Sequence, residues 1–372
     1  VASIDNCMRP YYCIVPYLCR KLTLSFSRRR KPYDNEIPNF SIATDFNIRI
    51  NFVCHLPLLC PGSGLEKKIY KFFEILVISK KAMGAKLSLG FDVGCSRHSS
   101  SLEDALSVLE RMNELLDGKK IRRTYFLLGS FVHEMTDNLS TREIDRYFGL
   151  ESSYVDIESH TFSHKAWRSI PTRPDVIPLT KEELREEVSK TGKLIQDKLG
   201  RKTFGVRSPY GYYGGLEERP ELVKVLCEED VRYISSDLRD KEWGISPGLY
   251  DDGKLRRARI YEDSELIEIP SHGWQDSAFA GSKTIGVPKF KEWPKNRLEG
   301  YVITHFSRLM LEAKEAALKE KMHVSVNTCF HPFAMGSYDK DLKILCGLLE
   351  FSERNGIRVG GYAEVAKINF KF

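Results

Sequence analysis

Two patterns of apolar and polar positions follow each other from about residue 83 to the end of the chain. Short apolar runs that are rich in β-branched residues and end in polar ones predict strands. Longer runs with apolar residues three and four apart predict amphipathic helices. The expected strands are 86–93, 124–129, 154–158, 203–207, 232–236, 266–269, 324–329 and 357–360. The expected helices are 102–116, 180–200, 221–228, 297–321 and 340–354.

The clearest helix start is Thr180. Its hydroxyl can cap the helix while Glu183, three residues later, reaches back to form a capping box, and Gly200 marks the end. Strands that alternate with helices favour an α/β fold with a mostly parallel sheet, closed or curled by right-handed crossovers. We therefore expect a distorted (β/α) barrel of seven to eight mostly parallel strands.

Titratable residues recur at the carboxyl ends of the expected strands. In a parallel barrel these ends meet on one face, where the chemistry is carried out. The sequence therefore predicts an active site on that face. The residues that follow the strands are Asp92, His160, Arg207, Asp237, His272 and His331.

The first 82 residues differ from the rest. They show no clean amphipathic period, and they hold 13 Lys and Arg against 6 Asp and Glu. Met83 stands directly before the first convincing strand. We expect Met83 to be the natural start and residues 1–82 to be an extension, poorly structured or not native, before a catalytic domain of residues 83–372. A small N-terminal domain is the alternative.

Charge, cysteine and hydropathy exclude several classes of protein. The net charge of +6 comes from the first 82 residues, so a nucleic-acid surface on the main body is not supported. The nine cysteines have no spacing typical of a disulfide framework or a zinc ribbon. No apolar run is long enough for a transmembrane segment, and no charge pattern indicates a signal peptide. We expect a cytoplasmic rather than a secreted protein; the oligomeric state stays open.

His160 and His164 are four residues apart, directly after an expected strand. On a helical turn or tight loop, this spacing can point both imidazoles at one ion. Neutral imidazole suits zinc and other borderline divalent metals. The pair therefore predicts a metal site.

Five motifs in order resemble those of the polysaccharide deacetylase family, carbohydrate esterase family 4, across residues 83–372. The family's Thr-Phe-Asp-Asp-Gly strand end is similar to Gly90-Phe91-Asp92-Val93-Gly94, and its His-Ser/Thr-x-x-His motif to the segment from His160 to His164. The others are Arg207-Ser208-Pro209-Tyr210, an approximate Asp237-Leu238-Arg239-Asp240 with Trp243 displaced, and Phe330-His331-Pro332.

The resemblance implies metal-assisted hydrolysis of an amide, most directly removal of an N-acetyl group from a sugar or oligosaccharide. It implies that Asp92 is the general base and that His331 protonates the leaving amine. It also implies that His160 and His164 hold a divalent metal, and that the Tyr210 N–H faces the oxyanion. Supporting residues would be Arg207 paired with Asp237 or Asp240, Pro209, and Trp243 or Trp274 as the floor of an acyl slot. His272 is expected either to line the pocket or to pack a loop.

Val93 departs from the family pattern. In the family, the second Asp of the Asp-Asp pair is the carboxylate of the metal triad, and valine offers no ligand atom. The alternatives are that Asp92 becomes the ligand, that Cys95, His98 or Glu158 substitutes, or that metal binding is weak or lost.

Two alternative functions follow from this departure. One is hydrolysis of a cyclic amide, as in allantoinases, which the stretch from Glu268 to Trp274 resembles. The other is a catalytically silent carbohydrate-binding relative.

Overall fold

The computed structural model describes residues 22–25, 40–44, 49–52, 84–94, 102–171, 173–239, 255–273 and 294–369. The chain divides into two units, Val1–Leu76 and Val77–Phe372. In the first unit, an antiparallel sheet has the order β1 (Leu22–Ser25), β2 (Phe40–Thr44), β3 (Arg49–Phe52). The expectation that the catalytic domain begins at residue 83 stays a prediction.

The second unit is built around two sheets of mostly parallel strands. The larger sheet has the order β10-β11-β9-β8-β7-β6-β5, in which the two-residue β10 runs antiparallel to β11. The smaller sheet has the order β12-β4-β13 and is parallel. The bounds are β4 (Gly84–Ser88), β5 (Gly90–Val93), β6 (Arg123–Leu127), β7 (Val155–Ser159), β8 (Gly205–Tyr212), β9 (Tyr233–Asp237), β10 (Arg259–Ile260), β11 (Ile267–Glu268), β12 (His323–Asn327) and β13 (Arg358–Gly360).

Backbone hydrogen bonds join the two sheets at two places. The N–H of Asp92 donates to the carbonyl of Phe330 at 2.8 Å, and the N–H of Phe330 donates to the carbonyl of Gly90 at 3.0 Å. On the other side, the N–H of His272 donates to the carbonyl of Asn327 at 2.8 Å. The strands therefore follow one another around a distorted barrel, and the predicted fold class is confirmed.

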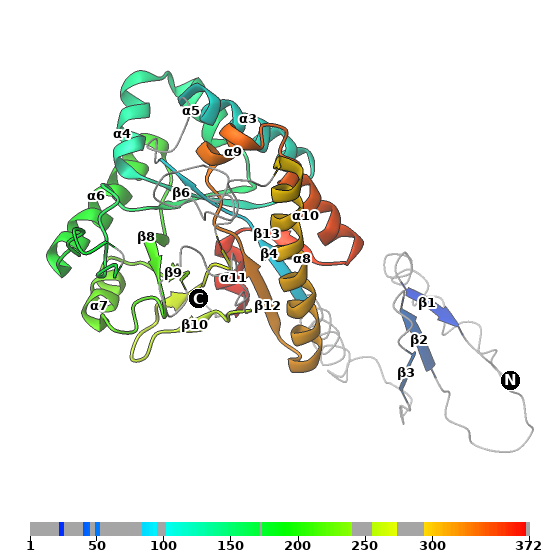
Figure 1. Cartoon of the computed structure of the whole chain (residues 1–372). Helices are drawn as coiled ribbons and strands as arrows, with labels where there is room; N and C mark the ends of the chain where they lie inside the picture. Colours follow the sequence, from blue (N-terminus) through cyan, green and yellow to red (C-terminus); the bar gives the residue numbers. More distant parts are fainter. Residues whose placement is uncertain are drawn as a thin grey trace, which may run out of the picture. The chain divides into compact units, whose positions relative to one another are not determined.

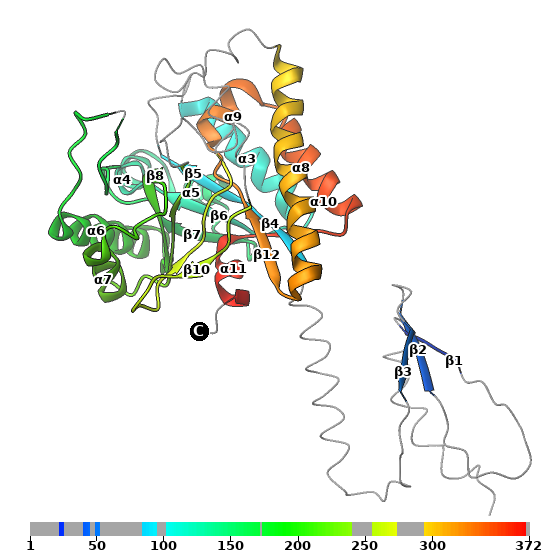
Figure 2. The ribbon, with the colours of Figure 1, turned by 60° about the horizontal axis from the view of Figure 1, so that its bottom comes forward.

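Helices cover the outside of the strands (Figure 1). They are α3 (Leu102–Gly118), α4 (Gly129–Asn138), α5 (Thr141–Phe148), α6 (Lys181–Leu199), α7 (Pro220–Glu228), α8 (Lys295–Glu320), α9 (Pro332–Tyr338), α10 (Lys343–Arg354) and α11 (Tyr362–Asn369). Figure 2 shows α6 and α7 at one side of the unit and α3, α8 and α10 at the other. Two separate clusters of buried apolar side chains correspond to these sides.

The predicted helix from Thr180 to Gly200 is confirmed. Thr180 and Glu183 form the capping box, and Gly200 ends the helix with φ 65°. Four helices were not expected from the sequence: α4, α5, α9 and α11. The expected strand 86–93 is divided into two strands at Leu89. This residue does not pair with β12, and its N–H donates to the carbonyl of Gly360. None of the helices in the described ranges has the length and apolarity that crossing a membrane requires.

Candidate active site

Asp92 lies at the centre of the predicted site. Its side chain is at the end of β5 and is 7% exposed. Its Oδ2 accepts a hydrogen bond from the thiol of Cys329 at 3.2 Å. The Nε2 atoms of His160 and His331 each lie 3.9 Å from the same oxygen. The structure therefore brings together three of the predicted residues and one cysteine that was not predicted.

Arg207 pairs with Asp92 directly. Its Nε lies 3.3 Å from Oδ1 of Asp92, and its side chain is 3% exposed. Burial would raise the pKa of Asp92, but the charge of the Arg207 guanidinium holds that pKa below its ordinary value. The carboxylate is therefore ionised at neutral pH.

The guanidinium of Arg207 is enclosed by aromatic rings. It lies 4.4 Å from the ring centroid of Phe126 and 4.8 Å from that of Tyr362. It also donates hydrogen bonds to Ser271 Oγ and the Thr328 carbonyl. A Cβ on Gly90 would lie 2.7 Å from Nη2, so this close approach requires glycine in the strand.

The expected pairing of Arg207 with Asp237 does not match these contacts. Oδ1 of Asp237 accepts from Arg256 Nη1 at 2.7 Å, and Oδ2 accepts from Arg259 Nη1 at 2.9 Å. These arginines come from a segment whose sequence shows no helix or strand pattern. Asp240, the other expected partner, lies outside the described residues.

The segment from His160 to His164 is a loop, and its two imidazoles are neighbours. Their ring centroids are 4.9 Å apart at 75°. Nδ1 of His160 lies 3.0 Å from the Arg207 carbonyl, so Nδ1 carries the proton and Nε2 offers its lone pair towards Asp92. Burial lowers the pKa of His160, which keeps the ring neutral as a metal ligand must be.

Glu187 of α6 fixes this loop. Its Oε2 accepts from the N–H groups of Phe162 at 2.9 Å and Ser163 at 2.7 Å, and its Oε1 accepts from the Ser163 hydroxyl at 2.5 Å. These bonds support a loop in which Thr161 and His164 have φ of 64° and 61°. Non-glycine residues persist in this region when surrounding contacts determine the backbone.

Pro209 and Tyr210 lie in an irregular part of β8. The pairing with β9 shifts register between Arg207 and Tyr212, and Tyr210 has φ 68°. Arg239 fixes this turn by donating from Nε to the carbonyls of Tyr210 at 3.0 Å and Gly211 at 3.1 Å. The Tyr210 ring lies 5.1 Å from that of His164, so the turn borders the histidine loop.

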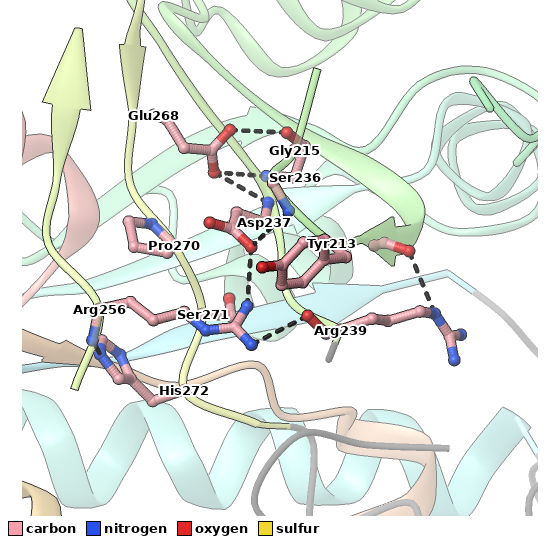
Figure 3. Close-up of polar contacts among 12 residues, drawn as sticks. Tyr213, Gly215, Ser236, Asp237, Arg239, Arg256, Glu268, Pro270, Ser271 and His272 are labelled. Atoms are coloured by element: carbon pink, nitrogen blue, oxygen red, sulfur yellow. Dashed lines mark hydrogen bonds and ion pairs between the residues drawn. The ribbon is translucent and has the colours of Figure 1, made fainter. Parts of the chain in front are cut away.

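A polar network supports the neighbouring strand ends (Figure 3). Glu268 accepts from the N–H groups of Ser236 at 2.8 Å and Asp237 at 3.0 Å. Backbone N–H groups of Arg256 and Asn327 point at the two ring nitrogens of His272, each at 3.0 Å. Burial lowers the pKa of His272 to about 3. Of the two expectations for His272, these contacts match the packing role.

Trp243, Trp274, Cys95 and His98 lie outside the described residues, as Asp240 does. Glu158, one candidate substitute ligand, instead accepts from the N–H groups of Phe204 at 2.7 Å and Gly205 at 2.6 Å and from the Tyr233 hydroxyl at 2.9 Å. Val93 is 0% exposed in the apolar core, where it provides no ligand.

Two residues of the site were missed by reasoning from the sequence, although each left a signal. Cys329 stands two residues before His331 in an extended segment, a spacing that puts both side chains on one face. Glu187 is an acidic residue beside Val188, on the apolar face of its helix. A charge on such a face indicates a specific partner.

The donor atoms around Asp92 have the chemistry of a metal site. Oδ2 of Asp92, Sγ of Cys329 and a ring nitrogen of His331 lie within 4.8 Å of one another. Oδ1 of Asp92 is buried and accepts no hydrogen bond from the described residues. Carboxylate, thiolate and imidazole are all ligands of zinc, so the side chains present fit a divalent metal.

Known proteins resemble this chain in part of its sequence and in its fold. Residues 80–217 match the family model for polysaccharide deacetylase. No curated protein matches the sequence. The fold is similar to that of a Mycobacterium smegmatis protein assigned to the polysaccharide deacetylases, with TM-score 0.52 and 15% identity over 77% of this chain and 90% of that one. It is also similar to that of Puue allantoinase, with TM-score 0.50 and 13% identity over 77% and 90%. With the motifs in order around Asp92, residues 80–217 are thus similar to the polysaccharide deacetylase family, and the likeness to the two solved structures extends the same fold over about three quarters of the chain.

Proposed function

We propose that residues 83–372 hydrolyse a non-peptide amide bond, and that the substrate is an N-acetylated sugar or oligosaccharide. The observation that carries this proposal is the ionised carboxylate of Asp92, whose Oδ2 lies 3.9 Å from the Nε2 atoms of both His160 and His331. An ionised carboxylate next to histidines can accept a proton from water and pass protons onward. The substrate is then a small molecule or carbohydrate rather than a nucleic acid.

Asp92 and His331 are the residues that move protons in this proposal. Asp92 accepts the proton of the attacking water, and Arg207 holds its carboxylate in position. The His331 side chain is 24% exposed, so it can reach a bound substrate and protonate the leaving amine. The N–H of Tyr210, in the turn fixed by Arg239, faces the developing oxyanion.

His160 and His164 would hold the divalent metal, which we propose to be zinc. When bound, the metal polarises the amide carbonyl and lowers the pKa of water. The chain contributes the orientation of the two rings through the Arg207 carbonyl and the Glu187 carboxylate. Such supporting contacts are worth about 10- to 100-fold in metal affinity.

Hydrolysis of a cyclic amide is the second candidate. The sequence feature behind it is the segment that begins at Glu268, but Glu268 and His272 are occupied by contacts to the backbone of neighbouring strands. The likeness to Puue allantoinase concerns the fold. The cyclic substrate is therefore the second candidate, because the side chains of the segment that suggested it are engaged in contacts within the protein.

Acetate release from N-acetylglucosamine oligomers tests the proposal. The full chain, reconstituted with zinc, should release acetate, and Asp92→Asn should lower kcat by about 100-fold or more. Asp175→Asn, a change at an exposed carboxylate, is the matched control. Turnover of a cyclic amide without acetate release would favour the second candidate. Sugar binding without either reaction would leave a catalytically silent relative.

A further inference from the structure

Cys329 reaches the site from the segment that follows β12. It is 2% exposed, and its thiol donates to Oδ2 of Asp92. His331, two residues later, places its Nε2 3.9 Å from the same oxygen. Two alternate positions of one extended segment and the end of β5 therefore bring sulfur, nitrogen and oxygen donors together.

The spacing of these donors suits tetrahedral coordination. Zinc takes sulfur at about 2.3 Å and nitrogen or oxygen at about 2.0–2.2 Å, so its ligand atoms lie roughly 3.3–3.7 Å apart. The separations from Asp92 Oδ2, 3.2 Å to sulfur and 3.9 Å to nitrogen, are close to this range. A thiolate also favours zinc over magnesium, calcium and manganese, which prefer oxygen.

We infer that Asp92, Cys329 and His331 form a zinc-binding position of their own, separate from the pair His160 and His164. Three protein ligands leave a fourth position open. On binding, the Cys329 thiol releases its proton to solvent as the sulfur–zinc bond forms, and His331 donates a ring lone pair. Asp92 and His331 are also the residues proposed to move protons, so an ion here blocks hydrolysis; this second half rests on the proposed function.

Thiolate-to-metal absorption tests the binding without reference to activity. The full chain is titrated with Cd²⁺, and its ultraviolet charge-transfer band is recorded for the wild type, Cys329→Ser, Cys227→Ser and His164→Ala. Cys227 is an exposed free cysteine and serves as the matched control. We expect the band to be weaker in Cys329→Ser than in the wild type, and to keep its Cys329-dependent part in His164→Ala. A Cys329→Ser titration equal to that of the wild type would overturn the inference.

Zinc dependence of turnover tests the inhibition. In the wild type, activity in excess zinc should be about tenfold or more below the activity at one equivalent of zinc. In Cys329→Ser the two activities should be nearly equal. Equal ratios in the two proteins would overturn the inhibitory role. If no substrate is turned over while the Cys329-dependent band is present, the proposed function fails and the binding position stands.

Discussion

Asp92 and Arg207 are a buried ion pair whose members depend on each other. Removing one partner of such a pair leaves an uncompensated charge, which costs about 3–5 kcal/mol. We therefore expect Arg207→Met to lower the free energy of unfolding by that amount, measured by urea denaturation. In the double variant Asp92→Asn/Arg207→Met, the uncompensated carboxylate of Asp92 is removed as well. The double variant should therefore be more stable than Arg207→Met alone. Fully additive losses would contradict the pairing.

At the residue scale, the sequence predicted which residues lie in the site better than it predicted which residues contact each other. Asp92, His160, Arg207 and His331 were identified because they follow strands, and strand ends share one face of a barrel. The partner of Asp237 was not identified, since Arg256 comes from a segment without periodicity. A long-range contact of this kind leaves no local pattern in the sequence.

Helix α6 begins at a capping box that is visible in the sequence, and it carries a residue that holds the histidine loop of the site. Its capping box is confirmed, and its buried Glu187 holds the loop that carries His160 and His164. We expect Glu187→Gln to weaken zinc binding about 10- to 100-fold, because glutamine has one carbonyl oxygen and an NH₂ group that cannot accept a hydrogen bond. Competition with a chelator measures this. Glu186→Gln is the control on the exposed side of the helix, and equal zinc affinity in both variants would exclude the supporting role.

At the scale of elements, long periodic segments were predicted and short ones were missed. The helix α6 has two caps and 19 residues, so local signals define it. By contrast, α5 and α9 have eight and seven residues, and the expected strand ran past Leu127 into Gly129, where α4 begins. Short helices depend on tertiary packing more than on their own periodicity.

The closure of the barrel has its own pH dependence. His272 bridges the segment after β11 to Asn327, and Nε2 of His305 donates to the His272 carbonyl at 2.8 Å. Burial lowers the pKa of His305 to about 4, as it lowers that of His272. Below a pH of about 6.5, the unfolded chain therefore binds more protons than the folded one. The folded state becomes less stable as the pH is lowered.

We expect the free energy of unfolding to drop by about 1.4 kcal/mol per pH unit for each of these histidines between pH 6.5 and their folded pKa values. Urea midpoints at pH 7.5 and 5.0 measure this. His305→Gln should be less stable than the wild type at pH 7.5 and lose less on acidification. An equal loss in both proteins would show that His305 does not contribute.

For the whole molecule, the alternation of strands and helices was sufficient to predict a parallel α/β barrel. It was not sufficient to predict how the barrel closes. The contact between His272 and Asn327 joins residues that lie more than 50 positions apart. Hydrophobic periodicity describes each element and does not determine which strand becomes the neighbour of another.

The pairing of β4 with β12 also has a consequence for synthesis on the ribosome. Gly84 of β4 pairs with His323, about 240 residues later in the chain. At about 5–20 residues per second, β4 leaves the ribosome roughly 12–48 seconds before its partner exists. During that interval its backbone donors and acceptors are exposed to pairing with other nascent chains. Slower translation should therefore increase aggregation of this protein, and chaperones that cover apolar strands should reduce it.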